Sequence, residues 1–549
     1  MGPDVARINL PFAASVTARQ HAGYTVHAGL VGEFVFIQGE DLAVLGRIVE
    51  VRLPESERLH VESRSGDALV SHPVGTVQLL ASLNLHTASA ISGIPEHPRL
   101  GQHVFSAHPK LLQQMVEGKE SGLLVELASM PQEPQTKVHV SPAHLFGRHC
   151  AVLGATGGGK SWTVARIIEE VERLGGKVVL IDPTGEFHPL AGAVQHVYLG
   201  GVPDDENAKR TLVGFPYWLL TELDLFAIFQ PSNATQAPKL REAIRSLKLA
   251  HVLHGDAAGT YIKAKKSRTE HYRTWAKNES LVEADGAKYS IKDLPKQILE
   301  ECVFEFARAP ADQDLWGDYS EQLRGYCETL VAKVFSIIRS KSLSCLFAPE
   351  VYVSLPDVID DFHRSGDAVL RISMESVPFE HNARELIVNA IGRHLLTRAR
   401  EGRYKKMPLV VVLDEAHQFL NKDIGNESHQ VRLDAFGIVA KEGRKYGLTS
   451  LVATQRPRDI PEDVLSQMGM FVVHRLINQR DREIVEKACG SLDGAAAAFL
   501  PTLGQGEAIL VGVDFPMPTP VSILAPRNPP ESKGPDYGQF WKPIAGKPE

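Results

Sequence analysis

Cysteine is scarce in this chain, and the few cysteines do not cluster. The five lie far apart, at Cys150, Cys302, Cys327, Cys345 and Cys489, and none belongs to a CxxC pair. Disulfide frameworks and structural zinc sites both need closely and regularly spaced ligands. The sequence therefore predicts neither, and it favours a protein of the reducing cytoplasm.

Long apolar segments and a basic excess are missing as well. No apolar run approaches the roughly 18 residues of a membrane span, and the start, MGPDVARINLPF, lacks the pattern of a signal peptide. We therefore expect a cytoplasmic protein that does not use a membrane. The net charge of −7 does not indicate nucleic-acid binding, although a ring can keep its basic residues inside a pore. A chain of 549 residues is long enough for three or four domains.

What the chain does have is a glycine-rich motif between an expected strand and an expected helix. Residues 154–161, GATGGGKS, match GxxxxGK[ST]; they follow the apolar run Cys150–Leu153 and precede a helical pattern that lasts to about Leu174. Glycines let the backbone fold closely around phosphate oxygens, and the helix start adds N–H groups and the positive end of its dipole. Lys160 is expected on the β- and γ-phosphates and Ser161 on Mg²⁺. The residues expected to contact the nucleotide are Gly154, Ala155, Thr156, Gly157, Gly158, Gly159, Lys160, Ser161 and Trp162.

The chain divides into five expected regions. Residues 1–120 show a β pattern, with strands predicted at Tyr24–Leu30, Glu33–Gln38, Ala43–Leu53 and Gly75–Leu83, which indicates a small barrel or sandwich. Residues 121–204 are the first part of an α/β nucleotide-binding core, 205–350 a helical insertion, 351–525 the second part of the core, and 526–549 an extended proline-rich arm. The insertion carries a basic run, Lys263–Arg268, which either touches nucleic acid or forms a solvated helix face.

The core is expected to be a parallel sheet with ligands at the carboxyl ends of its strands. Val178–Ile181 and Ala368–Ser373 read as buried strands, and Asp182 follows the first of them. Helices are predicted at Arg384–Arg400 and from about Gln430 to Tyr446. Further strands are predicted at Thr449–Ala453, Met470–Arg475 and Glu507–Val513.

An acidic strand completes the nucleotide-site pattern. The unbroken apolar run Leu409–Leu413 ends in Asp414 and Glu415. We expect Asp414 to hold Mg²⁺ through water and Glu415 to polarise the attacking water, although such a pair can also cap a helix. Gln455, at the end of the neighbouring strand, is expected to sense the γ-phosphate, or else to be a satisfied turn residue.

The motifs together resemble the HerA branch of the FtsK–HerA translocase superfamily of additional-strand P-loop ATPases. The segments that carry the resemblance are GATGGGKS, IDPTGEF, VVVLDEAHQFL, KEGRKYG, ATQRP, RLINQRDREIVEKACG and LPTLGQGEAILVGV. The β-rich start is similar to that family's N-terminal barrel, which is related to the barrel of rotary ATP synthases. The resemblance covers nearly the whole chain but is vague in the helical insertion.

The resemblance implies a RecA-like core and a homo-hexameric ring that hydrolyses ATP with Mg²⁺ and threads double-stranded DNA through its pore. It also implies a partner, either a NurA-like nuclease in DNA-end processing or a sirtuin-like or other nuclease effector in anti-phage defence. Since the chain shows no nuclease or NAD-consuming motif, such an activity is expected to come from that partner.

Two arginines are candidates for completing the site. Transition-state charge on a γ-phosphoryl group is best met by an arginine, often from a neighbouring subunit. Arg148 lies directly before the strand that leads into the glycine-rich motif, at a position similar to the trans arginine of the family, and Arg444 lies in KEGRKYG. Because an extended strand separates Arg148 from its own phosphates, Arg148 is expected to act in trans, whereas Arg444 is open to either role. Each can instead pair with a surface carboxylate.

Rival functions are weighed against this one. An ABC-type ATPase needs an LSGGQ-like signature, which is absent, and a kinase or small GTPase does not need the acidic strand with its glutamate and the sensor glutamine. A type IV secretion ATPase stays possible. The more serious rival is an ATP-gated oligomeric scaffold that assembles and switches a partner effector with little motor activity.

Overall fold

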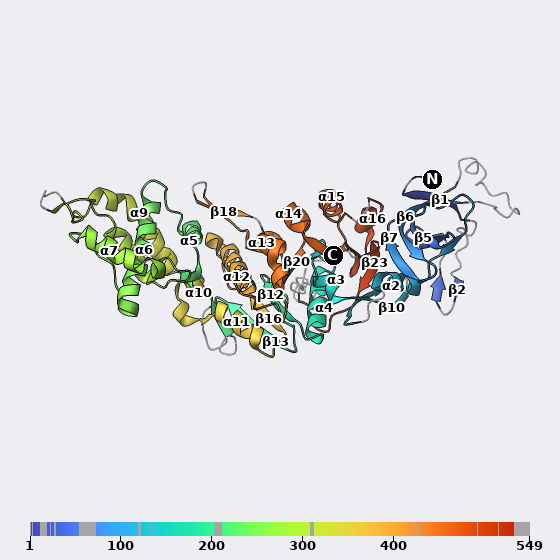
Figure 1. The fold of residues 1–549 in the computed structure, drawn as a ribbon, viewed down its shortest axis with the longest axis horizontal. Helices are drawn as coiled ribbons and strands as arrows, with labels where there is room; N and C mark the ends of the chain where they lie inside the picture. The colour runs from blue at the N-terminus through green and yellow to red at the C-terminus, as the bar shows by residue number, and fades with distance from the viewer. Residues whose placement is uncertain are drawn as a thin grey trace, which may run out of the picture.

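The structure is a computed structural model of the 549-residue chain. It describes residues 2, 4–10, 19–21, 24–26, 29–53, 73–118, 122–131, 133–201, 211–307, 312–420, 422–426, 429–490, 492, 494–513 and 515–531. The molecule is elongated, with an antiparallel sheet at one end, a large mixed sheet in the middle and a group of helices at the other end (Figure 1).

The N-terminal sheet is antiparallel and follows the sequence pattern closely. Its strand order is β1-β6-β5-β4-β8, with β7 paired to β6. Valines and isoleucines alternate toward one face, so that Ile48 and Val77 are fully buried between β5 and β6. Closure of this sheet into a barrel stays a prediction. Its strands are β1 Val5–Asn9, β4 Phe34–Gln38, β5 Leu42–Arg52, β6 Val74–Asn84, β7 Ser89–Ser92 and β8 Val104–Ser106.

The strand predicted at Tyr24–Leu30 is shorter in the structure. It forms β3 (Tyr24–Val26), which pairs with β2 (Arg19–His21) in a small hairpin. Residues 27 and 28 of the prediction lie outside the described part of the chain.

The central sheet confirms the α/β prediction. Its order is β10-β9-β23-β22-β21-β11-β20-β17-β12-β16-β13-β14-β15. The pairs from β21 to β15 are parallel, and the strands at the other end are antiparallel. Strand β20 is inserted between β11, which leads into the glycine-rich motif, and the acidic strand β17. The strands are β9 Val125–Met130, β10 Glu133–Val140, β11 His149–Leu153, β12 Lys177–Asp182, β13 Val194–Leu199, β14 Thr211–Gly214, β15 Val353–Ser354, β16 Val369–Ser373, β17 Leu409–Leu413, β20 Leu448–Thr454, β21 Met468–His474, β22 Glu507–Gly512 and β23 Thr519–Ile523.

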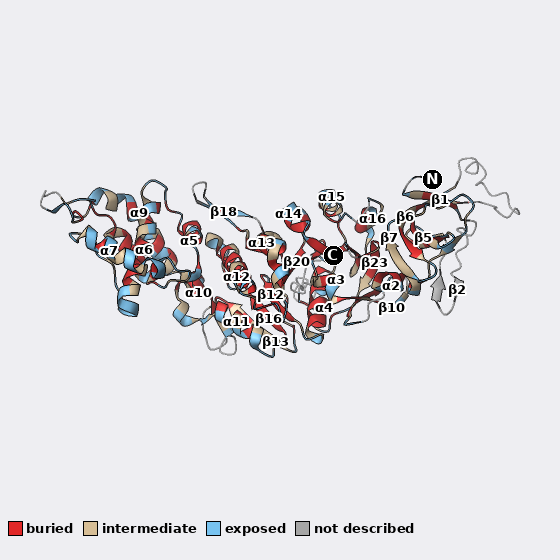
Figure 2. Ribbon diagram, viewed as in Figure 1, coloured by how far each residue is buried: buried red, intermediate tan, exposed pale blue. Residues whose placement is uncertain are grey.

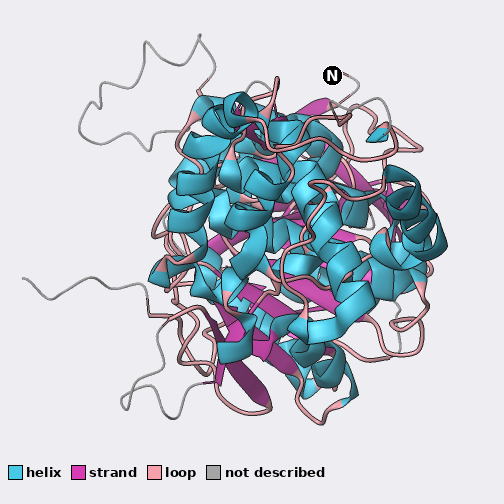
Figure 3. Ribbon diagram, turned by 90° about the vertical axis from the view of Figure 1, so that its left-hand side faces the viewer, coloured by secondary structure: helices cyan, strands magenta, loops and turns pink. Residues whose placement is uncertain are grey.

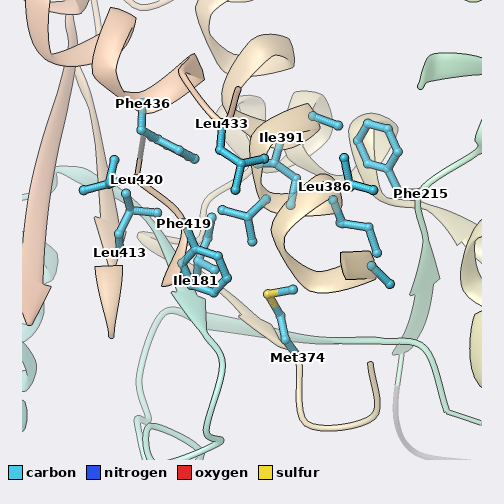
Figure 4. Close-up of a cluster of buried hydrophobic side chains, with 14 of the residues drawn as sticks. Ile181, Phe215, Met374, Leu386, Ile391, Leu413, Phe419, Leu420, Leu433 and Phe436 are labelled. Carbon is cyan, nitrogen blue, oxygen red and sulfur yellow. The ribbon is translucent and has the colours of Figure 1, made fainter. Parts of the chain in front are cut away.

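Helices cover both faces of this sheet, and neighbouring residues of one strand enter different cores. Cys150 and Val152 pack with α4, whereas Ala151 and Leu153 belong to the core on the opposite face. Such two-sided burial explains the unbroken apolar runs of the parallel strands. On the second face, Leu386 of α12 and Phe436 of α13 meet Ile181 and Leu413 (Figure 4). The helices around the sheet and its connections are α2 Pro109–Glu117, α3 Pro142–Phe146, α4 Lys160–Arg173, α11 Leu355–Arg364, α12 Ala383–Arg400, α13 Ala435–Glu442, α14 Glu462–Leu465, α15 Gln479–Ala488 and α16 Gly494–Phe499.

The insertion between β14 and β15 is helical. Seen from that end of the molecule, helices lie in front of the strands of the core (Figure 3). Its helices bury one side and expose the other (Figure 2), while six parallel strands of the central sheet, β11, β12, β16, β17, β20 and β21, are buried throughout. One short strand, β14, lies inside the range 205–350 that was expected to be helical, because it continues the sheet beside β13. The helices are α5 Glu222–Phe229, α6 Gln236–His254, α7 Arg268–Val282, α8 Leu294–Glu300, α9 Glu321–Ile338 and α10 Ser344–Phe347.

The prediction of a helix that begins at about Gln430 is wrong for its first residues. Residues His429–Arg432 form β19, which pairs with β18 (Asp423–Asn426), and α13 begins only at Ala435. Ile424 and Val431 face each other across this hairpin and are both buried. Burial of this pair overrides the weak helical pattern of the segment.

The described residues also bear on the cysteines, on membrane spans and on the C-terminal arm. All five cysteines are buried and free, and no helix there is long and apolar enough to cross a membrane. Residues 526–531 of the expected C-terminal arm form neither helix nor strand, and residues 532–549 lie outside the described part.

Candidate active site

The glycine-rich motif forms a tight turn at the carboxyl edge of the central sheet. Gly157 (φ 75°) and Gly159 (φ 113°) adopt left-handed backbone conformations that side chains disfavour. A Cβ at Gly154 would lie 2.6 Å from the Cβ of His474, so a larger residue would displace the loop. Helix α4 begins at Lys160, and its first N–H groups have no intrahelical acceptor. The turn therefore presents backbone donors to an anion.

Not every N–H group of the motif faces outward. Gly154 N donates to Thr454 O (3.3 Å) and Ala155 N to Arg475 O (3.0 Å), so these two amides fix the loop to β20 and to the end of β21. Gly158 N donates to Ala155 O (3.0 Å). Trp162 is 43% exposed at the start of α4, where its ring is accessible.

Lys160 is buried between two carboxylates. Its Nζ donates to Asp414 Oδ1 at 3.0 Å and to Glu415 Oε1 at 2.7 Å, and the lysine side chain is only 5% exposed. Burial favours the neutral amine, but attraction by Asp414 and Glu415 outweighs it and raises the pKa of Lys160. The lysine is therefore charged at neutral pH, and it is held at the mouth of the glycine-rich turn.

The two acidic residues differ in their surroundings. Burial raises the pKa of Asp414 to about 6; Lys160 opposes this rise and Glu415 adds to it. Glu415 adopts a left-handed backbone (φ 46°), which is strained for a glutamate and is typical of functional positions. Gln455 Nε2 donates to Glu415 Oε1 at 2.6 Å, and Thr156 of the motif donates to Gln455 Oε1. The structure thus joins Thr156, Gln455, Glu415 and Lys160 in one hydrogen-bonded chain.

The oxygen ligands at this edge suit Mg²⁺. Ser161 Oγ lies beside the Glu186 carboxylate (3.1 Å), and Asp414 ends the next but one strand of the sheet. Mg²⁺ takes hard oxygen ligands and keeps several waters, so it needs only one or two groups from the protein beside the phosphates. Among the described residues, no cluster of three or more acidic, histidine or cysteine side chains could hold a metal ion by itself.

The two candidate arginines lie at the opposite edge of the sheet. Arg148 precedes β11 and Arg444 precedes β20, so both stand at the amino ends of parallel strands, and both are exposed. They lie close together there: besides burial, the charge of Arg444 contributes to a pKa of about 4 for His149, the neighbour of Arg148. The seven residues of β20 span about 23 Å. Arg444 therefore lies at the same edge of the sheet as Arg148, and its role in cis or in trans stays a prediction.

The expectation for Asp182 is wrong, and sequence reasoning missed two residues that shape the site, Glu186 and His474. Asp182 does not face a ligand: it is fully buried and pairs with Arg371 of β16. In the segment IDPTGEF it is the side chain of Glu186, four residues after Asp182, that lies beside the P-loop serine. This spacing is the feature of the sequence that could have indicated Glu186. His474 lies beneath the glycine-rich turn, where its Nδ1 donates to Glu507 O (2.9 Å) and its Nε2 accepts from Thr163 (2.8 Å). No local pattern marks that histidine.

The basic run of the insertion is used within the fold. Lys263 pairs with Glu301 in the interior, Lys265 with Asp318 (2.9 Å) and Arg268 with Glu305 (3.4 Å). The expected solvated helix face is not formed, because α7 begins only at Arg268 and Lys263 is buried, and these ion pairs show that the run has partners within the fold.

Fold and site together define a P-loop NTPase with an additional strand between its P-loop strand and its acidic strand. Comparison with known families is more specific. The model of the helicase HerA central domain matches residues 125–311, and that of the helicase HerA-like C-terminal domain matches residues 396–535, which together make up more than half of the chain. The chain belongs to the HerA family of the FtsK–HerA superfamily and is an ATPase.

Individual relatives are distant but match over most of their length. The DNA double-strand break repair helicase HerA of Pyrococcus furiosus is 25% identical over 445 residues, covering 77% of this chain and 73% of that protein. The protein of the same name from Sulfolobus acidocaldarius is 23% identical over 415 residues, covering 74% and 70%. Among solved structures, VirB4 of Thermoanaerobacter pseudethanolicus is similar with a TM-score of 0.47 and 15% identity (74% of this chain, 98% of that one), and the conjugative coupling protein TrwB with 0.44 and 16% (76% and 94%).

The raised pKa of Asp414 gives a testable dependence of stability on pH. The folded state holds the Asp414 proton more tightly than the unfolded state does, so this group stabilises the nucleotide-free fold below about pH 4, and that stabilisation is lost as the pH rises through about 6. Asp414→Asn removes the charge but keeps an oxygen that can accept from Lys160, which also retains Glu415, so it should raise the apparent unfolding temperature at pH 8 and change it little at pH 4. Differential scanning fluorimetry without nucleotide measures both.

The matched control for this prediction is Asp361→Asn, since Asp361 forms an ion pair with Arg364 (2.6 Å) but is 76% exposed. It should show no gain at pH 8. An Asp414→Asn protein that is no more stable than wild type at pH 8 would contradict a raised pKa of Asp414 in the folded state.

Proposed function

We propose that this ATPase is a ring-shaped double-stranded DNA translocase or helicase that acts with a partner nuclease or effector. The observation that carries the proposal is the charge balance at the carboxyl edge of the sheet. Lys160 contacts both Asp414 and Glu415, and Glu186 adds a third carboxylate beside Ser161. A nucleotide bound there needs further positive charge.

Mg²⁺ and a neighbouring subunit can supply that charge. Ser161 and, through water, Asp414 are the residues that would hold Mg²⁺, which neutralises phosphate charge when bound. In this proposal Lys160 binds the β- and γ-phosphates, Glu415 orients the attacking water, and Gln455 links Glu415 to the γ-phosphate position. Arg148 and Arg444, exposed at the opposite edge, are then suited to reach the site of the next subunit in a ring, which we take to be a homo-hexamer.

DNA as the substrate is supported by the relatives, which are named as DNA double-strand break repair helicases and match most of this chain. A NurA-like nuclease or a sirtuin-like or other nuclease effector is the proposed partner, in DNA-end processing or anti-phage defence. The second candidate function, an ATP-gated scaffold for such an effector, rests on the large helical insertion, whose exposed helices offer a surface that the nucleotide site does not use.

ATP turnover in the presence and absence of linear duplex DNA separates the two functions. A motor should hydrolyse ATP faster with duplex DNA. Turnover that is indifferent to DNA but changes when an effector is added would support the scaffold and contradict the motor.

Two substitutions separate binding from chemistry. Lys160→Ala removes the phosphate cation and should abolish both ATP binding and turnover. Glu415→Gln keeps the shape but loses the charge that polarises water, so it should bind ATP with near wild-type affinity and lower turnover by at least about 100-fold. Equilibrium binding of labelled ATP, measured beside turnover, checks both. If Glu415→Gln loses binding together with turnover, Glu415 holds the structure or the metal.

Mixing two inactive proteins tests whether the sites are shared between subunits. Lys160→Ala and Arg148→Ala should each be inactive alone. If Arg148 acts in trans, mixed rings contain some interfaces with both residues intact, and part of the ATPase activity should return. Native mass spectrometry confirms mixing, and mixed rings without recovery would count against a trans Arg148.

A further inference from the structure

The turn after β12 places a carboxylate beside the P-loop serine. Ser161 Oγ donates to Glu186 Oε2 at 3.1 Å, across the gap between α4 and the residues that follow β12. Glu186 is half-buried, and this is the side-chain bond that joins it to the P-loop. Ser161 is the motif residue that is expected to bind Mg²⁺, so Glu186 stands next to the metal position.

The turn that carries Glu186 is rigidly built. The buried Asp182 accepts from Gly185 N at 2.8 Å and from Phe187 N at 3.1 Å, which fixes the amides on both sides of Glu186. Arg371 Nε donates to the same carboxylate at 2.8 Å, and neither side chain is exposed to solvent. Either partner left alone would be an uncompensated buried charge, so this pair holds the turn firmly.

Gly185 permits this turn to pack closely against Glu375. Its φ of 84° is left-handed, and a Cβ on it would lie 2.3 Å from the carboxylate of Glu375. Only glycine fits there.

The C-terminal segment holds the same turn from the other side. Glu531 N donates to Glu186 O at 2.9 Å. Upstream, the buried Glu169 of α4 accepts from Arg527 N and Asn528 N, both at 2.7 Å, so this segment runs along the P-loop helix before it reaches Glu186. The backbone of Glu186 is therefore tied to α4, to β12 and, through Arg371, to β16.

We propose that Glu186 is a third acidic residue of the nucleotide site, which positions Mg²⁺ by accepting a hydrogen bond from a water bound to the metal once the Ser161 hydroxyl turns toward the metal. The inference rests on the assignment of the chain as an ATPase. Asp182 cannot take this role because its oxygens are occupied by two amides and Arg371. Asp414 contacts Lys160 and Glu186 contacts Ser161, and the strands that these two acidic residues follow, β17 and β12, are neighbours in the sheet.

The simpler alternative is that Glu186 stabilises the positive end of α4. A carboxylate near a helix N-terminus stabilises the fold whether or not metal is present. Such a helix-end interaction would not need the hydrogen bonds that hold this turn to α4, to β12 and, through Arg371, to β16. The two roles differ in one measurable respect, since a metal-positioning residue affects nucleotide binding only when Mg²⁺ is present.

ADP binding to the full-length protein, measured by calorimetry with Mg²⁺ or with excess EDTA, tests the proposal. Wild type should bind ADP more tightly with Mg²⁺. Glu186→Gln should lose about 10-fold or more of this gain, as is typical when a partner of a metal ligand is removed, and should bind ADP in EDTA within about 2-fold of wild type. Glu186→Asp keeps the charge with a shorter reach and should fall between the two.

Glu375→Gln is the matched control. Its carboxylate packs against the same turn but bonds to Ser373 (2.8 Å) and Arg371 (3.5 Å), so this variant should keep the full Mg²⁺ gain. A Glu186→Gln protein with a wild-type Mg²⁺ gain, or one that loses affinity equally in Mg²⁺ and EDTA, would overturn the proposal. Failure of wild type to bind ADP under any condition would instead contradict the assigned nucleotide site.

Discussion

The contact of Lys160 with Asp414 and Glu415 is the interaction on which the rest of the site depends. A lysine ammonium in the interior is stable only when it is paired and hydrogen-bonded. Two carboxylates provide this, at 3.0 and 2.7 Å, and they can do so because β20 lies between β11 and β17 and sets the distance from the P-loop to the acidic residues. The cluster holds one positive and up to two negative charges. Phosphates can compete for the lysine, and Mg²⁺ can compensate the carboxylates that are left behind.

The orientation of the parallel strands divides the molecule into two functional edges. Residues that follow strands, including Asp414, Glu415 and Gln455, gather at the carboxyl edge, and residues that precede strands, including Arg148 and Arg444, gather at the amino edge. A single subunit cannot bring these edges together, because the strands between them are rigid. The ring that we propose would bring the amino edge of one subunit to the carboxyl edge of the next. The N-terminal sheet and the helical insertion lie at the two ends of the elongated molecule (Figure 1).

The sequence was informative where chemistry and local pattern coincide. The P-loop and the acidic strand Leu409–Leu413 were predicted with their boundaries, since glycines, lysine and buried apolar runs carry their own signals. Local pattern failed where tertiary contacts decide: the Ile424–Val431 pair turned a predicted helix start into a hairpin. The pairing of Asp182 with Arg371 joins residues far apart in the chain, and so does the placement of His474 under the P-loop. The geometry of Arg444 became clear only once β20 was placed in the sheet.

The central claim is that Lys160 exchanges its carboxylate partners for phosphates within an assembled ring. A structure of the protein with Mg²⁺ and a non-hydrolysable ATP analogue tests it most directly. We expect Lys160 Nζ to leave Asp414 and Glu415 for the β- and γ-phosphates. We also expect Arg148 or Arg444 of a neighbouring subunit to approach the γ-phosphate. A bound nucleotide with Lys160 still held at 3.0 Å from Asp414 and 2.7 Å from Glu415, and with no arginine from a neighbour, would contradict it.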